Sequence, residues 1–116
     1  MPAYLVYICQ EVFNRQELET YWSKIGSTLA DHAPKALAAY TPMEVLEPGK
    51  WGPVEGVTIH EFPSVEAIKA WYDSDAYREI REKHRFNGAT YLGLIIEGGL
   101  APPDERMPQT KGNVPA

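Results

Sequence analysis

Residues 3–9 read Ala-Tyr-Leu-Val-Tyr-Ile-Cys, and every one of these side chains is apolar or aromatic. A short run of this kind is typical of a β-strand, and an apolar group at every position predicts that both faces of the strand are buried. Residues 90–97 show the same pattern, and Gly98 with Gly99 ends that run. We therefore expect two strands of one sheet that carries large apolar groups on both faces.

The segment after the first strand predicts a long helix followed by a strand. Asn14 and Glu17 have the spacing of a helix N-cap and its capping-box partner. Pro34 should kink or restart the helix, with Ala36, Leu37 and Tyr40 continuing its apolar face. Residues 43–47 alternate between apolar and polar side chains and predict the second strand. The apolar face before Pro34 consists of Leu18, Trp22, Ile25, Leu29 and Ala33.

The second half of the chain predicts a strand, an interrupted helix and the last strand. Residues 56–62 form the third strand, and Ser64 caps a helix that Asp73-Ser74-Asp75 interrupts. The complete order is β-α-β-β-α-β, the ferredoxin-like α+β pattern with an antiparallel sheet. Both helices of that fold cover the same sheet face, so the second apolar face lacks cover in one chain. We therefore predict a homodimer that packs sheet on sheet as a dimeric α/β barrel.

Length and composition limit the class of protein. The chain has 116 residues, a formal charge of −5 and one cysteine. This length predicts one domain, residues 1–99, followed by a proline-rich C-terminal arm, residues 100–116. The negative charge argues against a nucleic-acid partner, and a single cysteine excludes a disulfide framework and favours a reducing compartment.

Localisation and cofactors follow from patterns that the sequence lacks. It has neither the features of a signal peptide at its start nor an apolar run long enough to span a membrane, so we expect a cytoplasmic protein without a membrane partner. It contains no phosphate loop and no glycine-rich dinucleotide motif, so we expect no cofactor. The three histidines, at positions 32, 60 and 84, do not have the spacing of a metal site.

Residues 61–77 read Glu-Phe-Pro-Ser-Val-Glu-Ala-Ile-Lys-Ala-Trp-Tyr-Asp-Ser-Asp-Ala-Tyr. A strand ending in Glu-Phe-Pro-Ser, then Glu-Ala, then Trp-Tyr-x-Ser-x-x-Tyr, resembles the family called domain of unknown function thirteen-thirty. Arg85 and residues 96–98, Ile-Glu-Gly, fit the same pattern, and the resemblance covers residues 3–98. It implies the dimeric α/β barrel superfamily, which includes antibiotic-biosynthesis monooxygenases, muconolactone isomerases, polyketide cyclases and stress-response proteins. In place of the family's glycine-rich second strand with its arginine, residues 39–45 read Ala-Tyr-Thr-Pro-Met-Glu-Val, so the role of that arginine is not carried over.

Glu61 and His60 are adjacent on the third strand, so their side chains point to opposite faces of the sheet. If Phe62 packs against the helices, His60 shares that face and Glu61 enters the barrel, where burial would raise its pKa. Glu61 is thus our first candidate for a catalytic base. The alternative is a structural ion pair across the dimer, for example with Arg85.

The remaining candidates are histidines and aromatic residues. His32, near the end of the first helix, is the second candidate base, or else only a histidine favoured by the helix dipole. His84 is expected to pack at the edge of the core. Trp51 either covers the mouth of the barrel or anchors its loop. The expected substrate-binding residues, which could instead fill the space between helix and sheet or bond across the dimer, are Tyr7, His60, Trp71, Tyr72, Tyr77, Arg85 and Tyr91.

These features favour a cofactor-free enzyme that moves a proton next to the carbonyl group of a small, partly apolar molecule. Isomerisation, dehydration and cyclisation all fit this chemistry. The first alternative is a non-catalytic dimeric protein that binds a small molecule or responds to stress, and the second is a cofactor-independent monooxygenase. A cavity between sheet and helices would favour the enzyme, whereas an interior filled by Tyr7, Ile59, Tyr91 and Ile95 would favour a protein without a substrate.

Overall fold

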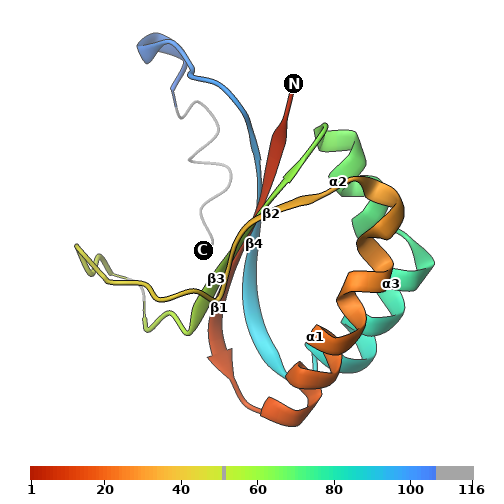
Figure 1. Ribbon diagram of the computed structural model, residues 1–116. Helices are drawn as coiled ribbons and strands as arrows, with labels where there is room; N and C mark the ends of the chain where they lie inside the picture. Colours follow the sequence, from red (N-terminus) through yellow and green to blue (C-terminus); the bar gives the residue numbers. More distant parts are fainter. Residues whose placement is uncertain (51, 107–116) are drawn as a thin grey trace.

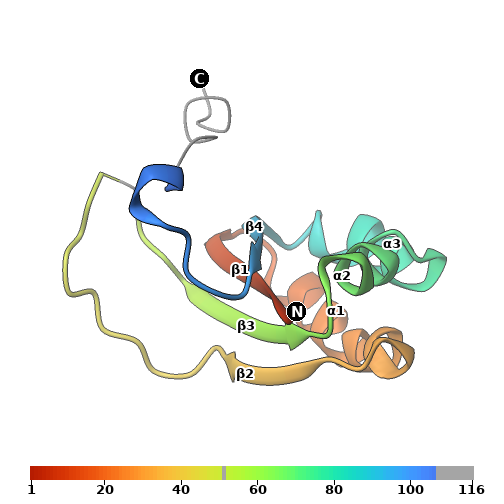
Figure 2. The ribbon, with the colours of Figure 1, turned by 90° about the horizontal axis from the view of Figure 1, so that it is seen from above.

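A computed structural model describes residues 1–50 and 52–106 of the chain. These residues form one four-stranded antiparallel sheet in the order β2-β3-β1-β4, and the helices lie on one side of it (Figures 1 and 2). The strands are β1 (Ala3–Val12), β2 (Lys35–Ala39), β3 (Gly56–Phe62) and β4 (Ala89–Glu97). The α-helices are α1 (Arg15–Leu29), α2 (Val65–Tyr72) and α3 (Asp75–Ile80). The short turns are η1 (Ala30–His32), the π-helical η2 (Arg81–Arg85) and η3 (Pro103–Glu105).

The predicted α+β fold is confirmed, because the element order is β-α-β-β-α-β with the second helix divided in two. Side-chain oxygens cap all three α-helices: Asn14 accepts from Glu17 N at 3.2 Å, Ser64 from Ala67 N at 3.1 Å, and Ser74 from Tyr77 N at 3.2 Å. Each cap satisfies an N–H that the first helical turn leaves without a partner. Ser74 starts α3 at the interruption that the sequence predicted.

The predicted second strand is wrong. Residues 43–47 lie in the loop between β2 and β3, and β2 occupies residues 35–39, where we expected the first helix to continue. Ala33 takes a left-handed conformation with φ of 51° after η1, and Pro34 cannot continue a helix, so the chain leaves α1 in an extended state. β2 then pairs with the free edge of β3, with Lys35 opposite Glu61 and Ala39 opposite Thr58.

The core lies between the sheet and the helices. Along β1, Ala3, Leu5, Tyr7 and Cys9 are buried on the helix side, whereas the alternate residues are only half-buried on the other face. Tyr21 from α1, Trp71 from α2 and Tyr77 from α3 close this core from the helix side. The loop between β2 and β3 and the segment after β4 both extend on the side of the sheet away from the helices (Figures 1 and 2).

Candidate functional site

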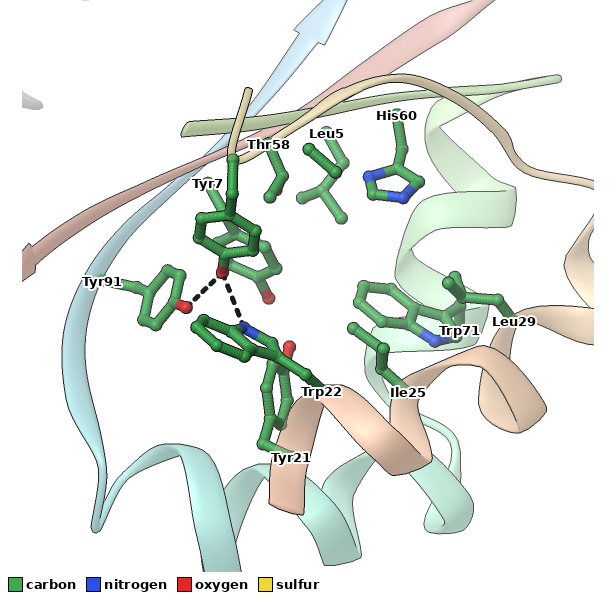
Figure 3. A pocket seen from close by; sticks show the side chains of 12 residues that line it. Leu5, Tyr7, Tyr21, Trp22, Ile25, Leu29, Thr58, His60, Trp71 and Tyr91 are labelled. Carbon is green, nitrogen blue, oxygen red and sulfur yellow. Dashed lines mark hydrogen bonds between the residues drawn. The ribbon is translucent and has the colours of Figure 1, made fainter. Parts of the chain in front are cut away.

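A cavity of about 230 Å³ lies between the sheet and α1 (Figure 3). Its walls are largely apolar and aromatic, with a few polar groups. His60 points into it from the sheet, and Trp71 and Ile25 face it from the helices. A concave, mostly apolar space with a few convergent polar groups is the usual form of a small-molecule site. The lining residues are Leu5, Tyr7, Tyr21, Trp22, Ile25, Leu29, Ala39, Tyr40, Thr58, His60, Trp71 and Tyr91.

His60 is the titratable group of this cavity that is placed to exchange protons near neutral pH. It lies on β3 opposite Leu5, on the helix side of the sheet, and burial lowers the pKa of its imidazole. A ring that is partly removed from water keeps its neutral form, which can accept a proton. The predicted separation of His60 from Glu61 holds, since Phe62 is buried on the helix side and Glu61 is opposite Tyr4 on the other face.

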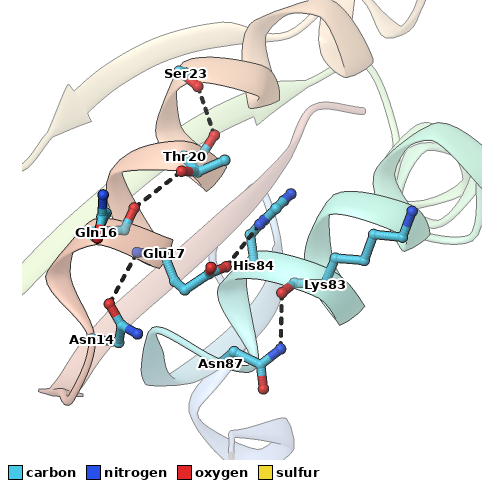
Figure 4. Close-up of polar contacts among 8 residues, drawn as sticks. All are labelled: Asn14, Gln16, Glu17, Thr20, Ser23, Lys83, His84 and Asn87. Atoms are coloured by element: carbon cyan, nitrogen blue, oxygen red, sulfur yellow. Dashed lines mark hydrogen bonds and ion pairs between the residues drawn. The ribbon is translucent and has the colours of Figure 1, made fainter.

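Glu61 and His32, the two predicted bases, do not line the cavity. Within the described residues Glu61 and Arg85 form no ion pair, and Arg85 is buried on the helix side of the sheet. The ion pair across a dimer stays a prediction. His32 lies in η1, beyond the end of α1. His84 Nδ1 lies 2.8 Å from Oε2 of Glu17, within hydrogen-bond distance, at the edge of the core (Figure 4). The Glu17 carboxylate therefore bonds to His84 in η2 and does not complete the predicted capping box with Asn14.

Two glycines of the sheet make room for two tyrosine rings. A Cβ on Gly93 of β4 would lie 2.7 Å from Cε1 of Tyr7, and a Cβ on Gly56 of β3 would lie 2.5 Å from Cδ1 of Tyr40. Real Cβ atoms do not come so close to a ring, so only glycine allows these rings to lie on the strands. Tyr7 therefore leans from β1 across β4, and Tyr40 lies across the end of β3.

Tyr40 and Trp22 are cavity residues that the sequence analysis did not identify. Tyr40 has a left-handed φ of 54°, a conformation that costs a non-glycine residue roughly 1–2 kcal/mol. Its hydroxyl accepts from Trp22 Nε1 at 3.0 Å and bonds to the Tyr91 hydroxyl. Its backbone N–H donates to Val57 O at 3.0 Å. The prediction that Tyr40 continues the helix is wrong, because Tyr40 directly follows β2.

Tyr77 is the centre of a second group of buried hydroxyls. Its oxygen lies 3.0 Å from the Tyr7 hydroxyl and 2.8 Å from the Tyr21 hydroxyl, and it accepts from Arg85 Nη1 at 3.3 Å. Burial raises the pKa of Tyr7, Tyr21 and Tyr77, so these phenols are neutral at physiological pH. Trp71 stacks on Tyr77 with 3.9 Å between ring centroids, and its Nε1 donates to Thr28 Oγ1 at 3.0 Å.

The predicted substrate-binding residues are divided between two cavities. A second cavity of about 440 Å³ lies between α2 and the β1–β4 side of the sheet. Tyr72 and Arg85 line this second cavity, whereas His60 and Trp71 line the first. Tyr7 and Tyr91 line both, with their rings edge-to-face at a centroid distance of 5.6 Å. Tyr77 contacts this shared wall through the hydrogen bond between its hydroxyl and that of Tyr7.

Two predictions concern residues that the structure does not describe. These residues are Trp51 and the part of the C-terminal arm from residue 107 onward. Within residues 1–50 and 52–106, no three histidine, cysteine or acidic side chains are grouped so that they could hold a metal ion. No helix in the same residues is both long and apolar enough to cross a membrane.

Comparisons with known proteins extend the description of the fold. A family model described as "Domain of unknown function (DUF1330)" matches residues 2–99, and a search of curated proteins gives no match. A structure of the RPA0582 protein of unknown function from Rhodopseudomonas palustris aligns with a TM-score of 0.69 at 19% identity, covering 87% of this chain and 84% of that one.

Two further solved structures share the fold at lower identity. SnoaB, a cofactor-independent oxygenase from Streptomyces nogalater, aligns with a TM-score of 0.52 at 12% identity over 88% of this chain and 96% of its own. A dabb family protein with a ferredoxin-like fold from Mesorhizobium loti aligns with a TM-score of 0.58 at 8% identity, covering 87% of this chain and 100% of that one. These likenesses show a ferredoxin-like fold and carry no information on activity.

Proposed function

Because the chain belongs to the DUF1330 family, whose description names no activity, we propose its function from the first cavity. The protein is a cofactor-free enzyme that binds a small, mostly apolar carbonyl compound there and moves a proton next to the carbonyl. His60 is the catalytic base, in place of Glu61 and His32. The observation that carries this proposal is the half-buried imidazole of His60 in an otherwise largely apolar and aromatic cavity.

The size and walls of the cavity support this ligand class. A dry cavity of about 150 Å³ holds benzene, so 230 Å³ suits a molecule somewhat larger than one ring. Trp22 and Trp71 provide aromatic surface for a planar body.

The polar groups near His60 suit the chemistry. His60 removes a proton from the carbon beside the carbonyl, and the electron pair moves to the carbonyl oxygen to give an enolate. Thr58 lies two residues before His60 on the same face, and its hydroxyl bonds to no other described residue, so it can donate to that oxygen. His60 then returns the proton at the same or another carbon, which completes exchange or isomerisation without a further reactant.

The test uses cyclohexanone in D₂O and follows exchange of its α-protons by NMR. His60→Gln should lower the exchange rate at saturating ketone by roughly a hundredfold or more, as expected for loss of a general base. Ile25→Trp, which fills the cavity, should abolish binding. Exchange that is unchanged in His60→Gln but lost in Glu61→Gln would refute the assignment of His60 and return the role to Glu61.

A binding protein without catalysis is the second candidate, and one observation favours it. The hydroxyls of Tyr40 and Tyr91 bond to each other, and that of Tyr7 bonds to Tyr77, so few polar groups are left for a reacting molecule. Saturable binding of cyclohexanone with no exchange above the protein-free rate would support this candidate. Oxygen uptake in the same assay would instead indicate the cofactor-independent oxygenase activity named for SnoaB.

We also propose that the working unit is a homodimer through the uncovered face of the sheet. Leu94 and Ile96 on this face are 39% and 47% exposed, and Leu46 in the loop beside it is 91% exposed. Val6→Glu at the centre of the face should convert a dimer into a monomer in light scattering, whereas Ala70→Glu on the outside of α2 should not. A 13 kDa species alone at micromolar concentration would refute the dimer.

A further inference from the structure

Arg85 is a buried cation for which the described residues provide no acidic partner. Its residue is 6% exposed, Nη1 donates to the Tyr77 hydroxyl at 3.3 Å, and Nε has no hydrogen-bond partner. Among residues 1–50 and 52–106, no carboxylate forms a salt bridge with it. The guanidinium carbon lies 4.9 Å from the centroid of the Tyr7 ring and 5.3 Å from that of Tyr91. Ring faces attract a cation, but they do not neutralise its charge.

This cation lines the second cavity, which differs in character from the first. Its volume is about 440 Å³, and Lys69 and Asp73 add charged groups to its walls. Leu5, Ile68 and Ile95 form an apolar surface beside them. One space therefore combines a buried positive charge with room for an apolar body.

We propose that the second cavity binds a small organic monocarboxylate, with the carboxylate on Arg85 and the apolar body on Leu5, Ile68 and Ile95. This site goes beyond the proposed function and does not depend on it. The planar guanidinium matches a carboxylate in two parallel hydrogen bonds, a geometry that the point charge of a lysine does not reproduce. A bound carboxylate also supplies the counter-charge that the described residues lack around Arg85.

The other charged groups of the cavity determine which anion fits. Lys69 is exposed on α2 and adds a second, screened attraction for the carboxylate. Asp73 follows α2 and places a negative charge on the same cavity. A second carboxylate on the ligand would meet this charge, so the cavity should favour a monoanion over a dianion.

Benzoate is a suitable probe, and benzamide is its neutral control of nearly the same shape. We expect saturable binding of benzoate to the full chain in an NMR shift titration, with benzamide at least about tenfold weaker. Phthalate, the dianion, should bind about two- to threefold more weakly than benzoate, and Asp73→Asn should remove that difference. Equal affinity for benzoate and benzamide would overturn the proposal.

Variants locate the site. Arg85→Lys keeps the charge but loses the planar fork, and should weaken benzoate by about tenfold. Ile95→Trp is a second test that leaves the buried cation intact, because Ile95 is partly exposed at the cavity wall and a larger ring there should exclude benzoate. Ile25→Trp fills the first cavity and should leave benzoate binding unchanged. Loss of benzoate binding in Ile25→Trp with retention in Ile95→Trp would place the ligand in the first cavity and refute this site.

Discussion

Replacing Tyr77 by phenylalanine removes a single oxygen from the centre of the core. The ring can stay where it is, 3.9 Å from Trp71, so the change tests hydrogen bonding and not packing. Three groups lose their partner: the hydroxyls of Tyr7 and Tyr21, and Nη1 of Arg85. All three belong to buried residues, where water cannot easily replace the missing oxygen.

The expected loss of stability follows from these contacts. A neutral hydrogen bond contributes about 1 kcal/mol and one to a charged group about 1.5–3 kcal/mol, and a buried group without a partner costs more than an exposed one. We therefore expect Tyr77→Phe to lower the free energy of unfolding by about 4 kcal/mol. Tyr21→Phe removes only one of the bonds and should cost about 1 kcal/mol.

Urea denaturation followed by circular dichroism at one protein concentration measures both values. With a slope of about 2 kcal/mol per molar, Tyr77→Phe should lower the midpoint by about 2 M. Tyr72→Phe is the matched control, because its ring lies 5.8 Å from that of Tyr77 and its hydroxyl bonds to no described residue. A Tyr77→Phe cost no larger than that of Tyr21→Phe would refute the view that Tyr77 holds three partners.

Two further predictions concern Gly93 and His60. Gly93→Ala places a Cβ 2.7 Å from the Tyr7 ring and should lower the free energy of unfolding by about 1–3 kcal/mol in the same denaturation assay. The control is Gly26→Ala on α1, whose Cβ meets nothing within 4 Å and which should raise the free energy of unfolding by about 0.5–1 kcal/mol. Burial lowers the pKa of His60 below its ordinary value of 6.5. As the pH falls below 6.5, the imidazole therefore takes up a proton more readily in the unfolded chain than in the folded chain, and the free energy of unfolding decreases. His60→Gln should therefore reduce the loss of stability between pH 7 and 5, measured by urea denaturation at each pH.

Local patterns predicted the directions of side chains well. Alternation along residues 56–62 placed Phe62 and His60 on the helix side and Glu61 on the other, and the structure has this arrangement. The N-caps predicted at Asn14 and Ser64 also form, since both side chains accept from the first helical turn. Both features depend on contacts within a few residues, which is why one sequence suffices to predict them.

Contacts between distant segments were not predictable in this way. Residues 35–39 contain alanine and leucine, which favour a helix in isolation, yet they form β2 because Pro34 stops the helix and β3 offers an edge with free hydrogen-bonding groups. Tyr40 then lies over Gly56 and joins the cavity. Residues 43–47 alternate like a strand but pair with no described strand.

The ferredoxin-like sheet with two apolar faces could be predicted from the order of residues, because the period of apolar residues sets which way each side chain points from its own backbone. The division of the candidate site into two cavities, with Tyr7 and Tyr91 lining both, could not. That division depends on how Tyr7 leans over Gly93 and on the burial of Arg85 behind it, and both arise from β1, β4 and η2 meeting in space. Side-chain periodicity contains no information about the shape of the space left between packed elements, which rotamers and neighbouring side chains determine.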